Sequence, residues 1–281
     1  MRGLAILNWA NTVRLILSGW YRAALHHAAL IKKRQTLPLW VPLLLVLVDF
    51  GLVAAWYHLS REFPVAAWAI SDLILYLARL ALVSIALRLS CSRCQVTPET
   101  LGIIPSRLVP DLRWAIKCCF LGSSVIGAVI ALGFLAAQAL GIHPPPPPEI
   151  ATELLGGSDW GARRLATLAI LGFTGVILAP FTEELIYRSA LLPPLTSRLG
   201  LYSAIPLTGV VFGLVHVVPL GELAIPAPQI LGGLMMAVAF SIRWSVIPSI
   251  VLHSLGNLFA GLLCLAYVRL YEACPTLFSG R

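Results

Sequence analysis

The chain has 281 residues, of which 59% are hydrophobic and only 11% are charged, and its formal net charge is +8. A soluble domain normally carries about 25% charged residues, so this composition excludes a soluble globular protein. It predicts an all-α, polytopic transmembrane helical bundle. The positive charge then indicates membrane topology rather than a nucleic-acid partner. No cleavable signal peptide of the usual form is expected, because no apolar stretch at the N-terminus ends in a small-residue cleavage site.

Residues 4–30 carry polar side chains three or four positions apart, which places them along one stripe of a helix. The residues of this stripe are Asn8, Asn11, Arg14, Ser18, Arg22 and His26. Leu, Ile and Trp cover the other faces. The pattern predicts an amphipathic helix lying in the membrane interface. The alternative is an eighth spanning helix.

Apolar stretches long enough to cross about 30 Å of hydrocarbon occupy most of the remaining chain. Seven spans are expected, at 38–59, 64–88, 114–142, 168–193, 203–219, 227–243 and 245–268. The segment HPPPPPEI (143–150) predicts a stiff polyproline spacer in an exposed loop. The expected organisation is a basic N-terminal segment (1–34), N-terminal transmembrane helices with the Pro-rich loop (35–160), a second transmembrane domain (161–270) and a tail (271–281).

The Lys and Arg residues indicate how these spans are oriented. With a cytoplasmic N-terminus, fourteen of the 20 Lys and Arg fall on the inner side and five on the outer side, while Arg79 lies within a span. This bias is the one that the positive-inside rule expects. The N-terminus is therefore predicted to be cytoplasmic, and the compact size with short loops favours a bacterial inner membrane.

Three polar motifs stand out in the apolar C-terminal half: EELIYR (183–188), FGLVH (212–216) and HSLGN (253–257). Key residues within each motif are four apart and so share a helix face. Glu183, His216 and His253 each lie ten residues from the residue that marks the cytoplasmic end of their span: Pro193, Pro206 and Arg243, respectively. Ten residues of helix are about 15 Å long, which places all three side chains near mid-bilayer. A charged carboxylate at that depth costs about 2.5–3.5 kcal/mol, so lipid contact is disfavoured. One shared polar site is predicted.

The adjacent glutamates of the first motif are expected to have different roles. Arg188 follows Glu184 by one helical turn and can neutralise it. Glu183 points about 100° away around the helix and is left for chemistry. A carboxylate in a low-dielectric cavity has its pKa raised toward neutral and can act as a general base.

The three motifs resemble EExxxR, FxxxH and HxxxN of the CPBP (CAAX protease and bacteriocin-processing, or ABI) intramembrane endopeptidases. The resemblance covers about residues 165–262 and implies a proteolytic site within the domain 161–270 that opens toward the cytosol. The catalytic residues that it implies are Glu183, His216, His253 and Asn257. The supporting residues that it implies are Glu184, Arg188 and Phe212.

In this family the first glutamate acts as the general base, so Glu183 is expected to activate a water together with His216. His253 and Asn257 are expected to stabilise the oxyanion of the tetrahedral intermediate. The resemblance points to a metal-independent, glutamate-type mechanism, and no cofactor is expected. The alternative is a catalytic zinc held by Glu183, His216 and His253.

The resemblance implies a membrane-anchored or lipidated protein or peptide as substrate: a CAAX protein, a peptide precursor or a C-terminal sorting tag. Two other functions stay open. One is a non-catalytic scaffold or immunity protein with the same motifs. The other is a transporter, since Asp49, Asp72 and Arg79 are also ionisable residues within predicted spans. Asp72 and Arg79 lie two turns apart on one helix face, where they are expected to bridge to another helix. A structural ion pair is a commoner explanation of such residues than an ion path.

Overall fold

The structure is a computed structural model. It describes residues 2–60, 63–120, 149–157, 161–216 and 226–274, together with the single residues 132, 140, 147 and 278. Within these residues all regular structure is helical, so the all-α prediction is confirmed. The Pro-rich loop and most of the third predicted span lie outside the described residues.

The N-terminal half begins with three long helices: α1 (Arg2–Lys32), α2 (Trp40–Ser60) and α3 (Val65–Cys94). Two short 3₁₀ turns (Pro98–Leu101 and Pro105–Arg107) lead into a helix over 108–120. The short helix α5 (Glu149–Leu155) precedes the C-terminal half.

The C-terminal half opens with one continuous helix over Ala162–Leu199. It consists of α6 (Ala162–Phe173), a π-helical turn η3 (Thr174–Leu178), α7 (Ala179–Glu184), a second π-helical turn η4 (Leu185–Leu191) and α8 (Leu192–Leu199). Three further helices follow: α9 (Leu201–Leu214), α10 (Ala227–Arg243) and α11 (Val246–Ala273).

Four of these helices are long and apolar enough to cross a membrane: α2, α3, the continuous helix 162–199 and α11. The predicted spans 38–59, 64–88, 168–193 and 245–268 correspond to them. Helices α9 and α10 are apolar but shorter, so the described residues do not establish the predicted number of seven spans. Large apolar side chains such as Leu47 and Ile74 are 66% and 62% exposed, which is expected of surfaces that face lipid.

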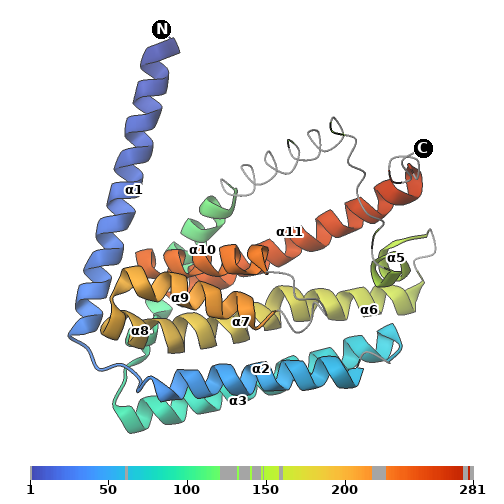
Figure 1. Ribbon diagram of the computed structural model, residues 1–281, viewed down its shortest axis with the longest axis horizontal. Coiled ribbons are helices and arrows are strands. Elements are labelled where there is room, and N and C mark those ends of the chain that lie inside the picture. Colours follow the sequence, from blue (N-terminus) through green and yellow to red (C-terminus); the bar gives the residue numbers. More distant parts are fainter. Residues whose placement is uncertain are drawn as a thin grey trace.

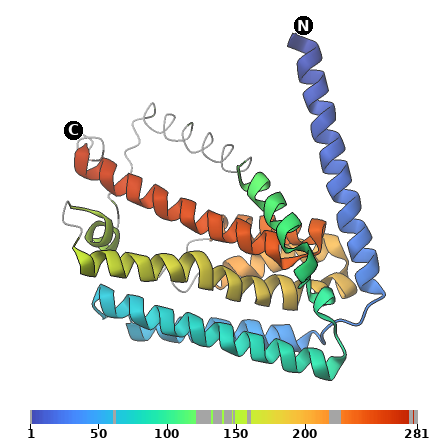
Figure 2. The same ribbon diagram turned by 180° about the vertical axis from the view of Figure 1, so that it is seen from behind.

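The helices form a layered bundle in which α2 and α3 run side by side beneath the long helix (Figures 1 and 2). Helices α9, α10 and α11 lie on the other side of the long helix. The larger of two apolar clusters is centred on its second half, where Ile186, Tyr187 and Ala190 are fully buried in the same cluster as Phe212 and Phe240. The continuous helix 162–199, which carries the EELIYR motif, is therefore covered from both sides.

Helix α1 runs crosswise to α2 and α3 (Figures 1 and 2). Its C-terminal part packs on the bundle through Ala24 and Ala28, which contact a cluster with Leu201 and Ile242. If α2 and α3 span the membrane, a helix crosswise at their end lies along the membrane surface. This arrangement favours the interfacial interpretation of residues 4–30 over an eighth span.

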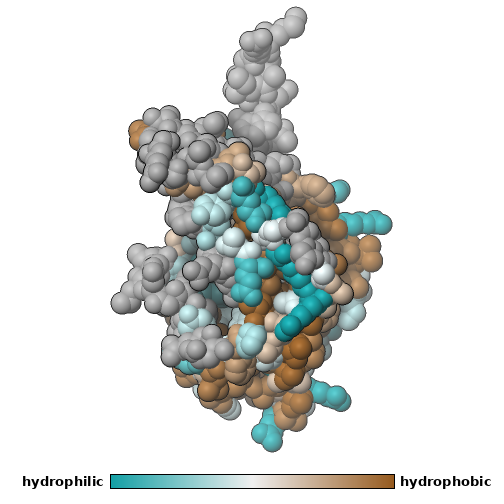
Figure 3. All heavy atoms as spheres, turned by 90° about the vertical axis from the view of Figure 1, so that its right-hand side faces the viewer, coloured by the Kyte–Doolittle hydropathy of each residue, from teal (hydrophilic) through white to brown (hydrophobic). Residues whose placement is uncertain are grey.

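The end of the bundle where α6 begins and α11 ends is polar. Figure 3 views this end and shows hydrophilic residues gathered near the middle, with hydrophobic surface below them. Arg164 Nε donates to the Leu154 carbonyl at 2.7 Å, and Arg269 Nη1 lies 3.1 Å from the Glu272 carboxylate. Such a group of charges fits the water-facing end of a bundle that crosses a membrane.

Candidate active site

The two glutamates of the first motif end the short helix α7, between the π-helical turns η3 and η4. π-Helical turns are rare and are frequently found at functional sites. Both side chains are buried, with Glu183 6% exposed and Glu184 0% exposed. Although they are neighbours in sequence, they face different sets of partners.

Glu184 is enclosed by charged and polar partners. Arg188 Nη1 donates to its Oε1 at 3.2 Å, and Arg188 Nε lies 3.1 Å from its Oε2. His253 Nδ1 lies 3.0 Å from the same Oε1. Arg188 also donates from Nη2 to the Gly233 carbonyl on α10 at 2.8 Å. Glu184 and Arg188 thus join α7, α10 and α11, as a supporting pair would.

Glu183 faces both histidines. Its Oε2 lies 3.8 Å from His216 Nε2 and 3.8 Å from His253 Nε2. The structure therefore brings together the three residues that the sequence placed at one membrane depth. A separation of 3.8 Å is too long for a direct hydrogen bond, but one water oxygen about 2.8 Å from each atom can bridge it.

The orientation of each imidazole follows from its Nδ1 partner. His216 Nδ1 lies 2.7 Å from the Phe212 carbonyl, and His253 Nδ1 lies 3.0 Å from the Glu184 carboxylate. Both partners accept hydrogen bonds only, so each Nδ1 carries a hydrogen. Each Nε2 is then directed toward Glu183, and in a neutral ring it is an acceptor.

Phe212 lies at the centre of the site. Its buried ring packs 4.7 Å from the His216 ring and 5.6 Å from the His253 ring, measured between centroids. It also meets the Tyr187 ring edge-on at 5.3 Å, and the Arg188 guanidinium lies 4.6 Å above it. Because an aromatic ring is rigid and bulky, these contacts restrict both histidines to one orientation.

Asn257 belongs to the same helix face as His253, one turn later. Its Nδ2 donates to the Gly175 carbonyl in the first π-helical turn at 2.7 Å. An amide nitrogen has two N–H groups, so this bond leaves a second donor for an oxyanion. The bond to Gly175 was not expected from the sequence.

The N-terminal helices also reach Glu183. Tyr76 Oη lies 3.5 Å and Arg79 Nη2 lies 3.9 Å from Glu183 Oε1. Arg79 is bonded at two points to Asp49 on α2, at 2.7 and 2.9 Å. Asp72 accepts a hydrogen bond from Trp56 Nε1 on α2 at 3.0 Å.

The predicted bridging of Asp72 and Arg79 to another helix is confirmed, with α2 as the partner helix. The contact of Arg79 with Glu183 was not predicted from the sequence. The one hint was that Asp49 and Arg79 are ionisable residues inside predicted spans. Tyr76 gave no hint at all, because a tyrosine in a span is unremarkable.

A cavity of about 830 Å³ adjoins the site between α2, α3, α5, α6 and α11. Most of its wall is apolar, with Trp56, Trp68 and Leu258 among the lining residues. Tyr76, Arg79 and Asn257 also line it. Cavities of 300–1,000 Å³ with a few polar groups are typical ligand sites.

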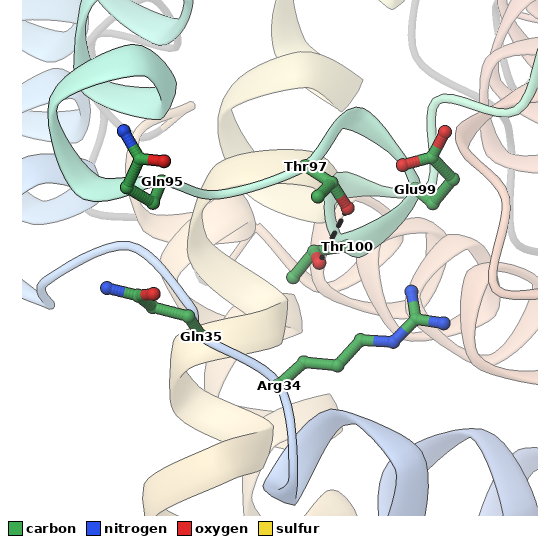
Figure 4. A pocket seen from close by; sticks show the side chains of 6 residues that line it. All are labelled: Arg34, Gln35, Gln95, Thr97, Glu99 and Thr100. Atoms are coloured by element: carbon green, nitrogen blue, oxygen red, sulfur yellow. Dashed lines mark hydrogen bonds between the residues drawn. The ribbon is translucent and has the colours of Figure 1, made fainter.

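A second cavity, of about 400 Å³, lies far along the chain from these motifs, at the loop after α3 and the link between α1 and α2. Figure 4 shows its lining of six polar or charged side chains, including Arg34 and Glu99, with the Thr97–Thr100 hydrogen bond of 3.3 Å. The pKa of the Glu99 carboxyl is lowered by its own backbone N–H and by Thr97. None of the motif residues lines this cavity.

Within the part of the chain that the structure describes, no three His, Cys, Asp or Glu side chains are grouped so as to hold a metal ion. The alternative zinc set of Glu183, His216 and His253 has both Nε2 atoms directed at the carboxylate. A guanidinium already lies 3.9 Å from that carboxylate, and like charges repel at this range.

Comparison with known proteins gives one family. Residues 165–259 match the model of the family described as Type II CAAX prenyl endopeptidase Rce1-like. No curated protein and no solved structure matches the chain significantly. The matched residues contain all three motifs and the whole Glu183–His216–His253 cluster. The matched segment, residues 165–259, is thus similar to CAAX proteases of the CPBP family, the family that its motifs resemble.

Proposed function

We propose that this chain is an intramembrane endopeptidase that hydrolyses a peptide bond of a membrane-anchored, prenylated CAAX protein with a water activated by Glu183. The match of residues 165–259 to the CAAX prenyl endopeptidase family supports this proposal. The observation that carries the proposal is the position of Glu183 Oε2, 3.8 Å from Nε2 of both histidines.

The chemistry begins with a water between Glu183 and His216. Glu183 takes a proton from this water, and the resulting hydroxide attacks the scissile carbonyl carbon. His216 holds the water through Nε2, since its Nδ1 is fixed by the Phe212 carbonyl at 2.7 Å. Glu183 then gives the proton to the leaving amine. A positioned base and acid of this kind contributes about 10²–10⁴-fold to the rate.

The tetrahedral intermediate carries a negative oxygen that needs donors. Asn257 has a second N–H beside the one that it gives to Gly175. His253 donates from Nε2 when the ring carries two hydrogens, with Nδ1 bonded to Glu184 at 3.0 Å. Removing one such donor costs about 10²–10³-fold in rate in known proteases.

The apolar cavity favours a substrate with a large apolar part. Its volume of about 830 Å³ and its contact with Tyr76, Arg79 and Asn257 allow an apolar group to lie beside the reacting bond. Prenylated CAAX proteins have such a group next to the cleavage site. We therefore favour them over peptide precursors and C-terminal sorting tags. We also propose that the N-terminus lies on the cytoplasmic side of the membrane.

The proposal includes a metal-independent mechanism. Arg79 supplies a positive charge 3.9 Å from Glu183, where a zinc bound to the same carboxylate would be repelled. Treatment with a strong zinc chelator is expected to leave turnover unchanged. Loss of turnover that returns on adding zinc would favour the set Glu183, His216 and His253 as ligands.

The test uses purified full-length protein in liposomes and a quenched fluorescent peptide that ends in an S-farnesyl cysteine and three further residues. Wild-type protein is expected to cleave after the cysteine, and Glu183→Gln to lose at least about 100-fold in kcat. Glu99→Gln is the matched control, because Glu99 is exposed and lines the separate cavity of Figure 4.

The same peptide without its farnesyl group tests the substrate class, and equal cleavage of both peptides would contradict a prenyl preference. A scaffold would give a different result: no cleavage by the wild type, and full biological activity for Glu183→Gln in cells.

A further inference from the structure

Arg79 is a buried cation that two carboxylates share. It is 2% exposed and bonded at two points to Asp49, with Nε to Oδ1 at 2.7 Å and Nη2 to Oδ2 at 2.9 Å. The same Nη2 lies 3.9 Å from Glu183 Oε1. Tyr76, one turn earlier on α3, places its hydroxyl 3.5 Å from that oxygen and its ring 4.3 Å from the guanidinium carbon. Four side chains from three helices thus form one connected group.

The two oxygens of Glu183 have separate surroundings. Oε1 faces Tyr76 and Arg79 on α3, whereas Oε2 faces His216 and His253 at 3.8 Å. A carboxylate is planar, so fixing one oxygen fixes the direction of the other. The contacts with α3 therefore aim Oε2 at the place where a water reaches both histidines.

An ion pair that served only the fold would not need this geometry. Replacing a buried ion pair by apolar residues is often neutral or stabilising, so a buried pair is weak evidence for a stabilising role. Arg79 Nη1 has no hydrogen-bond partner in the described residues. The guanidinium therefore does not have all its hydrogen bonds satisfied, but it contacts both Asp49 and Glu183.

We propose that Tyr76 and Arg79 are positioning residues for Glu183, and that Asp49 holds Arg79 in place for them. The inference rests on the proposed function, since it assigns Glu183 as the base. All three residues lie outside the matched segment 165–259. The active site is therefore completed by α2 and α3, and the matched segment does not contain every residue that turnover requires.

A charge exchange separates a positioning role from a structural ion pair. The double variant Asp49→Arg with Arg79→Asp keeps an Arg–Asp pair between α2 and α3, but it puts a carboxylate beside Glu183. Relative to Arg79→Gln, the exchange is expected to recover part of the lost Tm, the rest being opposed by repulsion between the new carboxylate and Glu183, while kcat stays at least about 100-fold below wild type. Recovery of kcat together with Tm would overturn the proposal.

Tyr76→Phe tests the contact without disturbing the ion pair. It removes only the hydroxyl 3.5 Å from Glu183 Oε1. We expect kcat for the farnesylated peptide to fall about 5- to 20-fold, with Tm and KM close to wild type, because the base is less well aligned. Unchanged kcat would overturn the role of Tyr76. This variant also keeps the proposal testable if Arg79→Gln does not fold.

Arg243→Gln is the control for losing a partly buried ion pair elsewhere. Arg243, at the end of α10, places Nε 2.8 Å from Asp111, which is fully buried in the helix over 108–120, and neither residue contacts the site. Its loss is expected to lower Tm while kcat stays within about twofold of wild type. A fall in kcat as large as that of Arg79→Gln would show a general effect of instability and would overturn the inference.

Failure of the proposed function has its own signature. If wild type cleaves the farnesylated peptide no faster than Glu183→Gln, the assignment of Glu183 as base for this substrate fails. The contact between Arg79 and Glu183 is then tested by Tm alone. The change in Tm caused by Glu183→Gln is measured once in the wild type and once in the Arg79→Gln variant. The two changes in Tm are expected to differ by at least about 2 °C, because the residues interact directly. Equal changes would overturn the positioning role as well.

Discussion

The matched segment and the helix pair α2–α3 differ in how they hold their polar residues. In the segment 165–259, Glu184 and Arg188 are fully buried and joined to α10 and α11, within a core where Tyr187 is also fully buried. Helices α2 and α3 instead expose large apolar surfaces to lipid and reach the site by a few side chains. Substitutions in the segment should therefore affect stability most, and those in α2–α3 should affect chiefly the alignment of Glu183.

The strongest expected effect on stability is at Arg188. Arg188→Gln leaves Glu184 buried with only His253 as a partner, and breaking a buried ion pair costs about 3–5 kcal/mol. The free energy of unfolding in detergent micelles measures this loss. Arg198→Gln, an exposed arginine ten residues later on the same continuous helix, is expected to change it by less than about 0.5 kcal/mol. Equal effects would mean that the segment's core does not depend on its ion pair.

The next effect tests the close packing of α9 on α10 within the segment. A Cβ added at Gly233 would lie 3.0 Å from the Gly209 Cα and 3.0 Å from its carbonyl oxygen. Backbone atoms cannot rotate away, so Gly233→Ala is expected to cost about 1–3 kcal/mol. A shift of the backbone at this position would also disturb the hydrogen bond from Arg188 to the Gly233 carbonyl.

Gly232→Ala is the matched control for this variant. The added Cβ meets only the end of Met236 at 3.9 Å. Because alanine favours helix over glycine by about 1 kcal/mol, this change is expected to be neutral or stabilising. The free energy of unfolding of both variants, measured by denaturation, tests this difference. If Gly233→Ala is as stable as Gly232→Ala, then α9 and α10 separate easily.

The residue pairs within each motif of the candidate site were predictable because their geometry is local. Glu184 with Arg188, Phe212 with His216 and His253 with Asn257 are each one helical turn apart, and polar groups in an apolar span rarely face lipid. Four predicted spans also correspond to the four long apolar helices. Helical periodicity and hydropathy were therefore sufficient to predict these residue pairs and these four spans.

The contacts of Glu183 Oε1 were not predictable in the same way. The position of Tyr76 and Arg79 depends on how α3 is rotated and how deep it sits against the long helix, and side-chain packing sets both. The hydrogen bond from Asn257 to the first π-helical turn joins residues that are 82 apart in sequence. Neither property is encoded in the spacing of one segment.

A smaller effect is expected within α2–α3 at Trp56. Its indole Nε1 donates to the part-buried Asp72 at 3.0 Å, and Trp56→Phe removes this donor at a cost of about 1 kcal/mol. Trp40→Phe on the same helix is the control, because Trp40 is 66% exposed. The free energy of unfolding should separate the two variants. If Trp56→Phe costs as much as Arg188→Gln, the contrast between the two regions is wrong.

The smallest effect concerns the contact of α1 with α10, at the cytoplasmic end predicted from the charges. His27 Nδ1 lies 3.3 Å from the Ser241 carbonyl. Burial lowers the pKa of His27 below its ordinary value of 6.5, and the nearby Arg107 and Arg243 act in the same direction, while the bond to Ser241 opposes them. The unfolded chain therefore binds this proton more readily than the folded one, and stability is lost as the pH falls below about 6.5.

His27→Gln removes this proton-linked loss, because glutamine does not titrate and can still donate to Ser241. The fall in Tm between about pH 7.5 and about pH 5.5 is expected to be smaller in His27→Gln than in wild type. His58→Gln is the control, since His58 is exposed at the end of α2. A pH dependence identical in wild type and His27→Gln would mean that α1 does not bury His27 against α10. The crosswise helix would then be loosely attached to the bundle, and its place along the membrane surface would depend on lipid rather than on this contact.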